Sequence, residues 1–155
     1  KQICEDLESV HYFGIATDAG NHSTEKFFPL IVQYFTVKNG ITVKVLKLDS
    51  LKNETAIEIS SYCVNALEEN YIDKRKCIAF CGDNANTNFG GVRRSGTNNV
   101  FKLKSELNEN LLGVGCPAHI LHNAAKVATD VLTVDVETII IKLIFFQYIL
   151  YARSA

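Results

Sequence analysis

Residues 77–91 read CIAFCGDNANTNFGG, and they hold the most informative pattern in the chain. An apolar run over residues 77–81 leads through a glycine to a single carboxylate, Asp83, in a segment rich in amides and glycines. A short apolar run bounded in this way predicts a strand that is buried on both faces, as in a parallel sheet. Ligands of α/β proteins bind near the carboxyl ends of such strands. Asp83 is therefore the first candidate site residue.

A second acid occupies a similar position far upstream. Residues 12–17 form an apolar run that leads directly into Asp18, and residues 19–22 (AGNH) follow it. Two carboxylates at the ends of two strands predict a site for a divalent metal ion. The spacing alone leaves an alternative open, in which Asp18 forms an Asx turn or cap and Asp83 caps a helix.

The rest of the chain is divided by its apolar periodicity and its turn signals. Asn39-Gly40 predicts a tight turn between two antiparallel strands. The elements expected in order are a polar helix over 1–9, strands over 11–17, 27–37 and 41–48, a helix capped by Asn53 from 55 to about 70, a strand over 77–81, a helix over 99–108, a strand over 111–116, a helix over 117–130 and a last helix from about 135. The aromatic residues of the second strand are expected in the core; they are Phe27, Phe28, Tyr34 and Phe35.

After the first helix this order is β-β-β-α-β-α-β-α, and it predicts an α/β fold with a mixed sheet and helices on its faces. It is the order of the ribonuclease H fold, with residues 1–155 as a single domain. In that fold the first and fourth strands are neighbours, so Asp18 and Asp83 are expected to face one another. Two such carboxylates can hold Mg²⁺, and two metal ions about 4 Å apart support phosphodiester chemistry.

Composition restricts the classes of function. The chain of 155 residues has 47% hydrophobic and 21% charged residues, as soluble globular domains do. Its net charge of −1 is unlike that of a basic nucleic-acid-binding domain, so any affinity for DNA is expected to come from other segments of a longer protein. Five scattered cysteines predict reduced thiols in an intracellular protein. The apolar stretch 139–150 is shorter than the about 20 residues needed to cross a bilayer, so we expect no membrane partner and a buried or interface helix instead.

Cys116, His119 and His122 form a second constellation at the start of the helix over 117–130. They offer three zinc ligands without a clear fourth, which leaves structural zinc as the weaker alternative. A polar role for His119 near the two carboxylates is the favoured interpretation, whereas His122 is expected to be an ordinary core or surface residue. The amides at residues 84, 86 and 88 either satisfy turns, which is the default, or contact a phosphate.

The motifs ATDAGNH (16–22), FCGDNANTNFGG (80–91) and GVGCPAHILHN (113–123) resemble the catalytic region of hAT-superfamily DNA transposases and of cellular proteins derived from them. The similarity covers nearly the whole chain. It implies a ribonuclease H-like fold with an Asp-Asp-Glu triad that uses Mg²⁺ or Mn²⁺ to cut and join DNA strands in the nucleus. By position, Asp18 matches the first acid and Asp83 the second, and His119 matches the histidine of the family's Cys-x-x-His motif near the active site.

The resemblance also implies a third acid that this sequence does not contain. In the family, a glutamate follows a long helical insertion downstream of the Cys-x-x-His helix, and Ala155 precedes that position. Glu106 and Glu137 lie in the wrong places to replace it. We therefore expect an incomplete transposase core that retains two metal-site positions. The alternative is a domesticated, non-catalytic scaffold domain, whose apolar helix over 139–150 binds a protein partner or a second copy.

Overall fold

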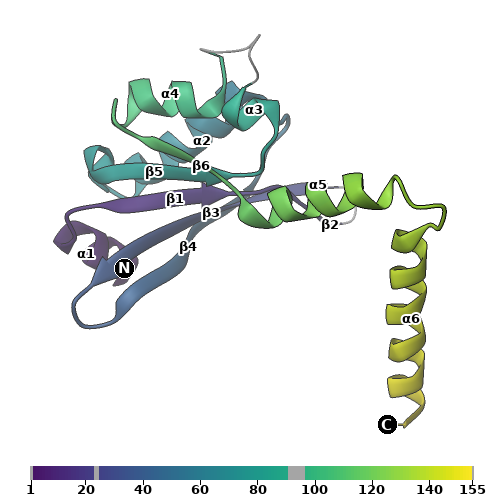
Figure 1. Cartoon of the computed structure of the whole chain (residues 1–155). Helices are drawn as coiled ribbons and strands as arrows, with labels where there is room; N and C mark the ends of the chain where they lie inside the picture. Colours follow the sequence, from purple (N-terminus) through teal and green to yellow (C-terminus); the bar gives the residue numbers. More distant parts are fainter. Residues whose placement is uncertain (1, 23–24, 91–96, 155) are drawn as a thin grey trace. The chain divides into compact units, whose positions relative to one another are not determined.

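The computed structural model describes residues 2–22, 25–90 and 97–154, so Gly91 of the opening motif lies outside the described residues. The chain divides into two compact units. We call Lys1–Cys116 the sheet unit and Pro117–Ala155 the helical unit, and we describe each by itself. The chain is a mixed α/β protein, as predicted (Figure 1).

The described residues of the sheet unit form one mixed sheet of six strands. The strands are β1 (Phe13–Thr17), β2 (Gly20–His22), β3 (Glu25–Thr36), β4 (Gly40–Ser50), β5 (Cys77–Gly82) and β6 (Leu112–Gly115). The long strand β3 pairs in antiparallel fashion with β1 and β2 and with β4. This confirms the predicted antiparallel arrangement of the first three long strands. Strand β5 then pairs in parallel with both β1 and β6.

The short strand β2, which ends at His22, was not predicted. Thr17 pairs with Leu30 and Gly20 pairs with Phe27, so β1 and β2 keep one register along β3. In that register Asp18 falls opposite Pro29. Proline has no backbone N–H to donate to its partner strand. Pro29 of β3 therefore explains why the pairing is interrupted between β1 and β2.

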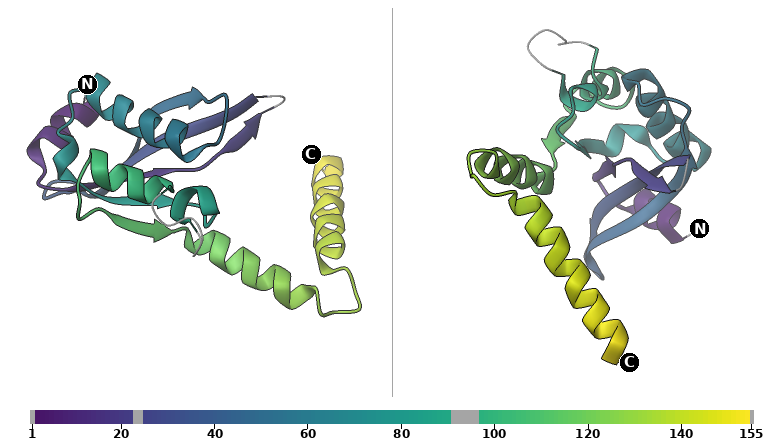
Figure 2. Two further views of the ribbon diagram at one scale, coloured as in Figure 1. Left: turned by 90° about the horizontal axis from the view of Figure 1, so that it is seen from above. Right: turned by 90° about the vertical axis from the view of Figure 1, so that its right-hand side faces the viewer.

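The core of the sheet unit lies between one face of the sheet and its helices (Figure 2). These helices are α1 (Gln2–Ser9), α2 (Ala56–Glu69), the 3₁₀ turn η1 (Lys74–Lys76), α3 (Asn86–Phe89) and α4 (Asn99–Glu106). The buried side chains of α2, among them Ile59, Cys63 and Leu67, belong to the same cluster as Phe13 and Leu30 of the sheet. Leu7 of α1 and Leu103 of α4 belong to it as well.

The cap of α2 differs from the predicted one. Thr55, not Asn53, is the N-cap, and its side chain accepts a hydrogen bond from the backbone N–H of Glu58. Asn53 instead donates through its side chain to the Glu58 carboxylate, at 3.3 Å. Asparagine and threonine are both favoured N-cap residues, so either could cap this helix. Thr55 is the N-cap because the helical backbone begins at Ala56.

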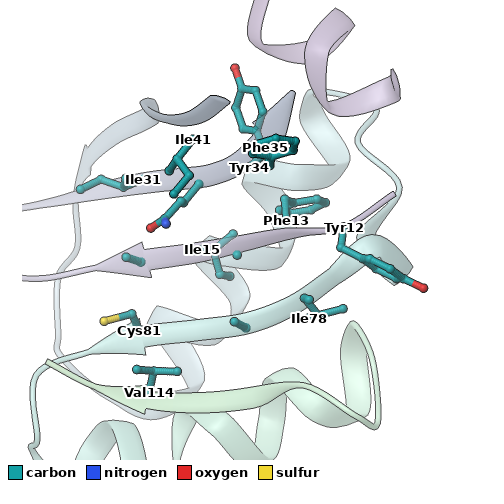
Figure 3. A pocket seen from close by; sticks show the side chains of 14 residues that line it. Tyr12, Phe13, Ile15, Ile31, Tyr34, Phe35, Ile41, Ile78, Cys81 and Val114 are labelled. Atoms are coloured by element: carbon teal, nitrogen blue, oxygen red, sulfur yellow. The ribbon is translucent and has the colours of Figure 1, made fainter. Parts of the chain in front are cut away.

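The second face of the sheet has an apolar groove of about 430 Å³ (Figure 3). Its lining includes Tyr12, which directly precedes β1, and residues of three strands: Ile31 and Phe35 of β3, Ile78 of β5 and Val114 of β6. Phe35 is 62% exposed here, so its predicted place in the core was wrong. Phe27 is only partly buried, whereas Phe28 and Tyr34 are buried as predicted. The reason is the alternation of side chains along β3, which sends successive residues to opposite faces.

The helical unit consists of α5 (Pro117–Thr129) and α6 (Val136–Ser154), close to the predicted bounds. Asp135 caps α6, because its carboxylate accepts hydrogen bonds from the backbone N–H and the hydroxyl of Thr138. None of the described helices is long and apolar enough to cross a membrane.

Candidate metal centre

Asp18 lies at the end of β1, in the interruption opposite Pro29. Its side chain is exposed, and one carboxylate oxygen accepts a hydrogen bond from the backbone N–H of Ala19, at 2.9 Å. The Asx-type interaction considered from the sequence is thus present at this residue. It involves one oxygen of the carboxylate, Oδ1, and so does not exclude a ligand role for the other.

Asp83 directly follows β5 and is held more firmly than Asp18. Its Oδ1 atom accepts hydrogen bonds from the backbone N–H of Ala85, at 3.2 Å, and from the side-chain amide of Asn88, at 2.6 Å. Asn88 is 7% exposed, and its own carbonyl oxygen accepts a hydrogen bond from Asn99 Nδ2, at 2.5 Å. Asn99 is fully buried at the start of α4. This chain of amides fixes the orientation of the Asp83 carboxylate from the core outward.

Two glycines allow the amides to approach the strand ends. A Cβ atom on Gly82 would lie 2.8 Å from Asn88 Nδ2, and one on Gly115 would lie 2.1 Å from Asn84 Oδ1. Asn84 donates to the backbone carbonyl of Cys116, at 3.2 Å. Asn84 and Asn88 thus satisfy protein groups near the ends of β5 and β6, and phosphate contact by these amides stays a prediction. A side chain at either glycine would displace an amide that supports the site.

The structure brings the carboxylates of Asp18 and Asp83 together. Their ligand oxygens lie within 4.8 Å of one another, at the carboxyl ends of the neighbouring parallel strands β1 and β5. The predicted proximity of these strands is confirmed, and the metal-binding role of the two acids stays a prediction. A small cavity of about 60 Å³ lies beside them, and its lining includes Thr17 and Glu54.

The donor atoms around this cavity fit a hard divalent cation. Asp18 and Asp83 offer carboxylate oxygens, which Mg²⁺ and Mn²⁺ prefer, whereas Glu54, which also lines the cavity, is paired with Lys26. Thr17 is 5% exposed, and its Oγ1 atom has no hydrogen-bond partner among the described residues. A buried hydroxyl without a partner is costly, so a polar group in the cavity would relieve it.

His119 and His122 lie on α5 in the helical unit, whereas Asp18, Asp83 and Cys116 belong to the sheet unit. The role predicted for His119 near the carboxylates therefore stays a prediction, and so does the zinc alternative. All five cysteines are free thiols. Burial raises the pKa of the Cys81 thiol, and the neighbouring Cys116 and Asp18 raise it further.

Sequence reasoning missed four residues that shape the centre: Thr17, Glu54, Asn88 as a positioning residue, and Asn99. Asn88 carried a signal, since it lies in the amide-rich run. Glu54 and Asn99 carried none, because their positions depend on how α2 and α4 pack on the sheet.

No family model matches the chain, and no curated protein matches it.

Proposed function

We propose that the chain is the ribonuclease H-like core of a hAT-type DNA transposase, or of a protein derived from one, and that it binds Mg²⁺ or Mn²⁺. The observation that carries the proposal is the position of Asp18 and Asp83 at the ends of adjacent parallel strands, with ligand oxygens within 4.8 Å. The strand order β4-β3-β1-β5-β6 supports it, because three antiparallel strands followed by two parallel ones are expected for this fold.

In this proposal each acid has a defined task. The Asp83 carboxylate, held by Ala85 and Asn88, orients one ligand oxygen, and Asp18 supplies a second from the less restrained strand end. The bound cation would supply activation of the nucleophile and stabilisation of the leaving oxygen in phosphodiester cleavage. The third acid and the DNA-binding surfaces would come from other parts of a longer protein in the nucleus.

Calorimetry of Mn²⁺ binding to the full chain tests the proposal. We expect Asp18→Asn and Asp83→Asn each to weaken binding by about tenfold or more, because each removes a charged ligand. Asp73→Asn is the matched control, since Asp73 lies before the amino end of β5 and is paired with Arg75. If the wild-type chain binds no Mn²⁺, or if all three variants bind equally, the proposal fails.

A second candidate function is a non-catalytic interaction domain with the same fold. The apolar groove on the second face of the sheet favours it, because exposed apolar surfaces of this kind mark contacts with other proteins. The partner would be a second copy or another protein. Light scattering tests this candidate: a well-folded chain that stays monomeric at high concentration and does not bind apolar dyes would count against it.

A further inference from the structure

A second hollow, of about 580 Å³, lies beside the candidate metal centre. Asp18 and Ala19 line both this hollow and the small cavity near Asp83. The other residues of its lining are Gly20, Asn21, Phe27, Pro29 and Leu48. Its volume is in the range of small-molecule sites, which are mostly apolar and have a few polar groups. The hollow therefore adjoins the centre through Asp18, and its whole lining belongs to the sheet unit.

The apolar wall of the hollow comes from the second face of the sheet. Phe27 and Pro29 are two residues apart on β3, so their side chains share the face that bears Phe35. Leu48 of β4 pairs with Pro29 and is 61% exposed. Among the described residues of the lining, Asp18 is the only charged one. The hollow thus has an apolar wall and a single carboxylate at the side of the metal centre.

Gly20 keeps the hollow open beside Phe27. The two residues pair directly across β2 and β3, so the aromatic ring has no side chain opposite it in β2. A Cβ atom at Gly20 would have no heavy atom of the described residues within 4 Å, apart from its chain neighbours. The backbone of Gly20 is not left-handed, so its conformation does not require a glycine. The missing side chain leaves free space next to the ring.

The separation between the carboxylate and the ring fits one nucleotide. Asp18 falls opposite Pro29, and Phe27 lies two residues, about 7 Å, further along β3. A base is joined to its phosphate through a single sugar, so a phosphate on a cation at Asp18 would leave its base within reach of Phe27. Bases stack on aromatic side chains, and this stacking tolerates any sequence because every base has a π face.

We propose that the hollow holds the base of the nucleotide whose phosphate lies at the metal centre, in a single strand of DNA, and that Phe27 is its stacking platform. This inference rests on the proposed function and names the substrate group next to the reacting phosphate. Because the wall is apolar, the hollow contacts the face of a base rather than its edges. Adenine and guanine nucleotides should therefore bind with similar affinity.

Calorimetry and saturation-transfer NMR of the full chain with Mg²⁺ test the inference. The probe is deoxyadenosine monophosphate, and deoxyribose phosphate is the matched ligand without a base. We expect the nucleotide to bind at least about fivefold more tightly, because stacking of one base on an aromatic side chain gives a gain of this size. Saturation should pass from the protein to the protons of the base.

Two variants test whether the base lies in this hollow. Gly20→Val fills the space beside Phe27 without meeting another described atom, and valine is favoured in strands, so the fold should persist. It should abolish the preference for the nucleotide and leave the Mn²⁺ affinity unchanged. Phe27→Leu should remove most of the preference, because it removes the ring. Phe35→Leu is the matched control, since Phe35 is an exposed aromatic residue of the same strand and face in the apolar groove (Figure 3), and it should have no effect.

The outcomes distinguish this inference from the proposed function. Equal affinity for the two ligands, or a preference that survives Gly20→Val, would overturn the inference and leave the two-aspartate site intact. A wild-type chain that binds no Mn²⁺ would overturn the proposed function and the inference with it. Self-association that Gly20→Val abolishes, seen by light scattering without a nucleotide preference, would show that the hollow holds a second copy and would also overturn the inference. Far-ultraviolet circular dichroism of each variant checks that the fold is retained.

Discussion

The sheet unit and the helical unit are both rich in apolar residues, yet they use them differently. In the sheet unit, α2 buries one side, including Cys63 and Leu67, while Ile57 on its other side is 63% exposed. In α6, the consecutive residues Ile139, Ile140 and Ile141 are all at least 44% exposed. A helix that is apolar on every side is stable only against a partner. Apolar content alone therefore does not make a core; the arrangement of the apolar residues around the helix decides it.

The same contrast applies to polar groups. In the sheet unit, the buried amides of Asn88 and Asn99 are joined to each other and to Asp83, because a buried polar group requires a partner. In the helical unit, α5 has no buried residue in the part of the chain that the structure describes. A preorganised site is thus expected in the sheet unit.

The largest effect that tests this contrast is the removal of apolar volume. Leu67→Ala should lower the free energy of unfolding by about 2–5 kcal/mol, because Leu67 is fully buried. Ile141→Ala, at a residue that is 60% exposed, should change it by about 0.5 kcal/mol or less. Urea unfolding followed by circular dichroism measures both. Similar losses in the two variants would show that α6 is packed as tightly as α2.

The sequence predicted the parts of the fold that depend on local periodicity and on chain order. The long strands and helices follow from apolar patterns, and the proximity of Asp18 and Asp83 follows from the pairing of β1 with β5. Strand β2 could not be predicted in this way, because its three residues show no apolar alternation and its position is set by pairing with β3.

The supporting residues of the site were beyond local reasoning for a different reason. Asn99 contacts Asn88 only because α4 returns to the end of β5, and Glu54 lines the cavity only because α2 packs on the sheet. The prediction for Phe35 was wrong for another reason. Its aromatic side chain favoured a place in the core, but the alternation of side chains along β3 places it on the second face of the sheet, where it is exposed. Tertiary packing decides these cases, and a single sequence does not encode it in short patterns.

A medium effect tests the contrast between the polar groups. Asn88→Ala leaves the buried Asn99 amide without its acceptor, so we expect a loss of about 1–3 kcal/mol in the free energy of unfolding. The same change removes a donor to Asp83 and should weaken Mn²⁺ binding. Asn123→Ala, on an exposed position of α5, is the matched change in the helical unit and should have almost no effect on either quantity. Equal effects of the two changes would contradict the difference between the polar groups of the two units.

The smallest effect concerns the helix caps, which have the same chemistry in both units. Thr55→Ala removes the N-cap of α2 and should cost about 1 kcal/mol in the cooperative unfolding of the sheet unit, whereas Asn53→Ala should cost clearly less. Asp135→Ala removes the corresponding hydrogen bonds at the start of α6. None of the described side chains of α6 belongs to the core cluster of the sheet unit, so we expect faster amide hydrogen exchange in α6 alone and an unchanged unfolding midpoint for the sheet unit. Hydrogen exchange followed by mass spectrometry resolves the two units. An unfolding midpoint of the sheet unit that falls as far for Asp135→Ala as for Thr55→Ala would mean that the two units unfold together. The apolar sides of α6 would then have their partner within this chain.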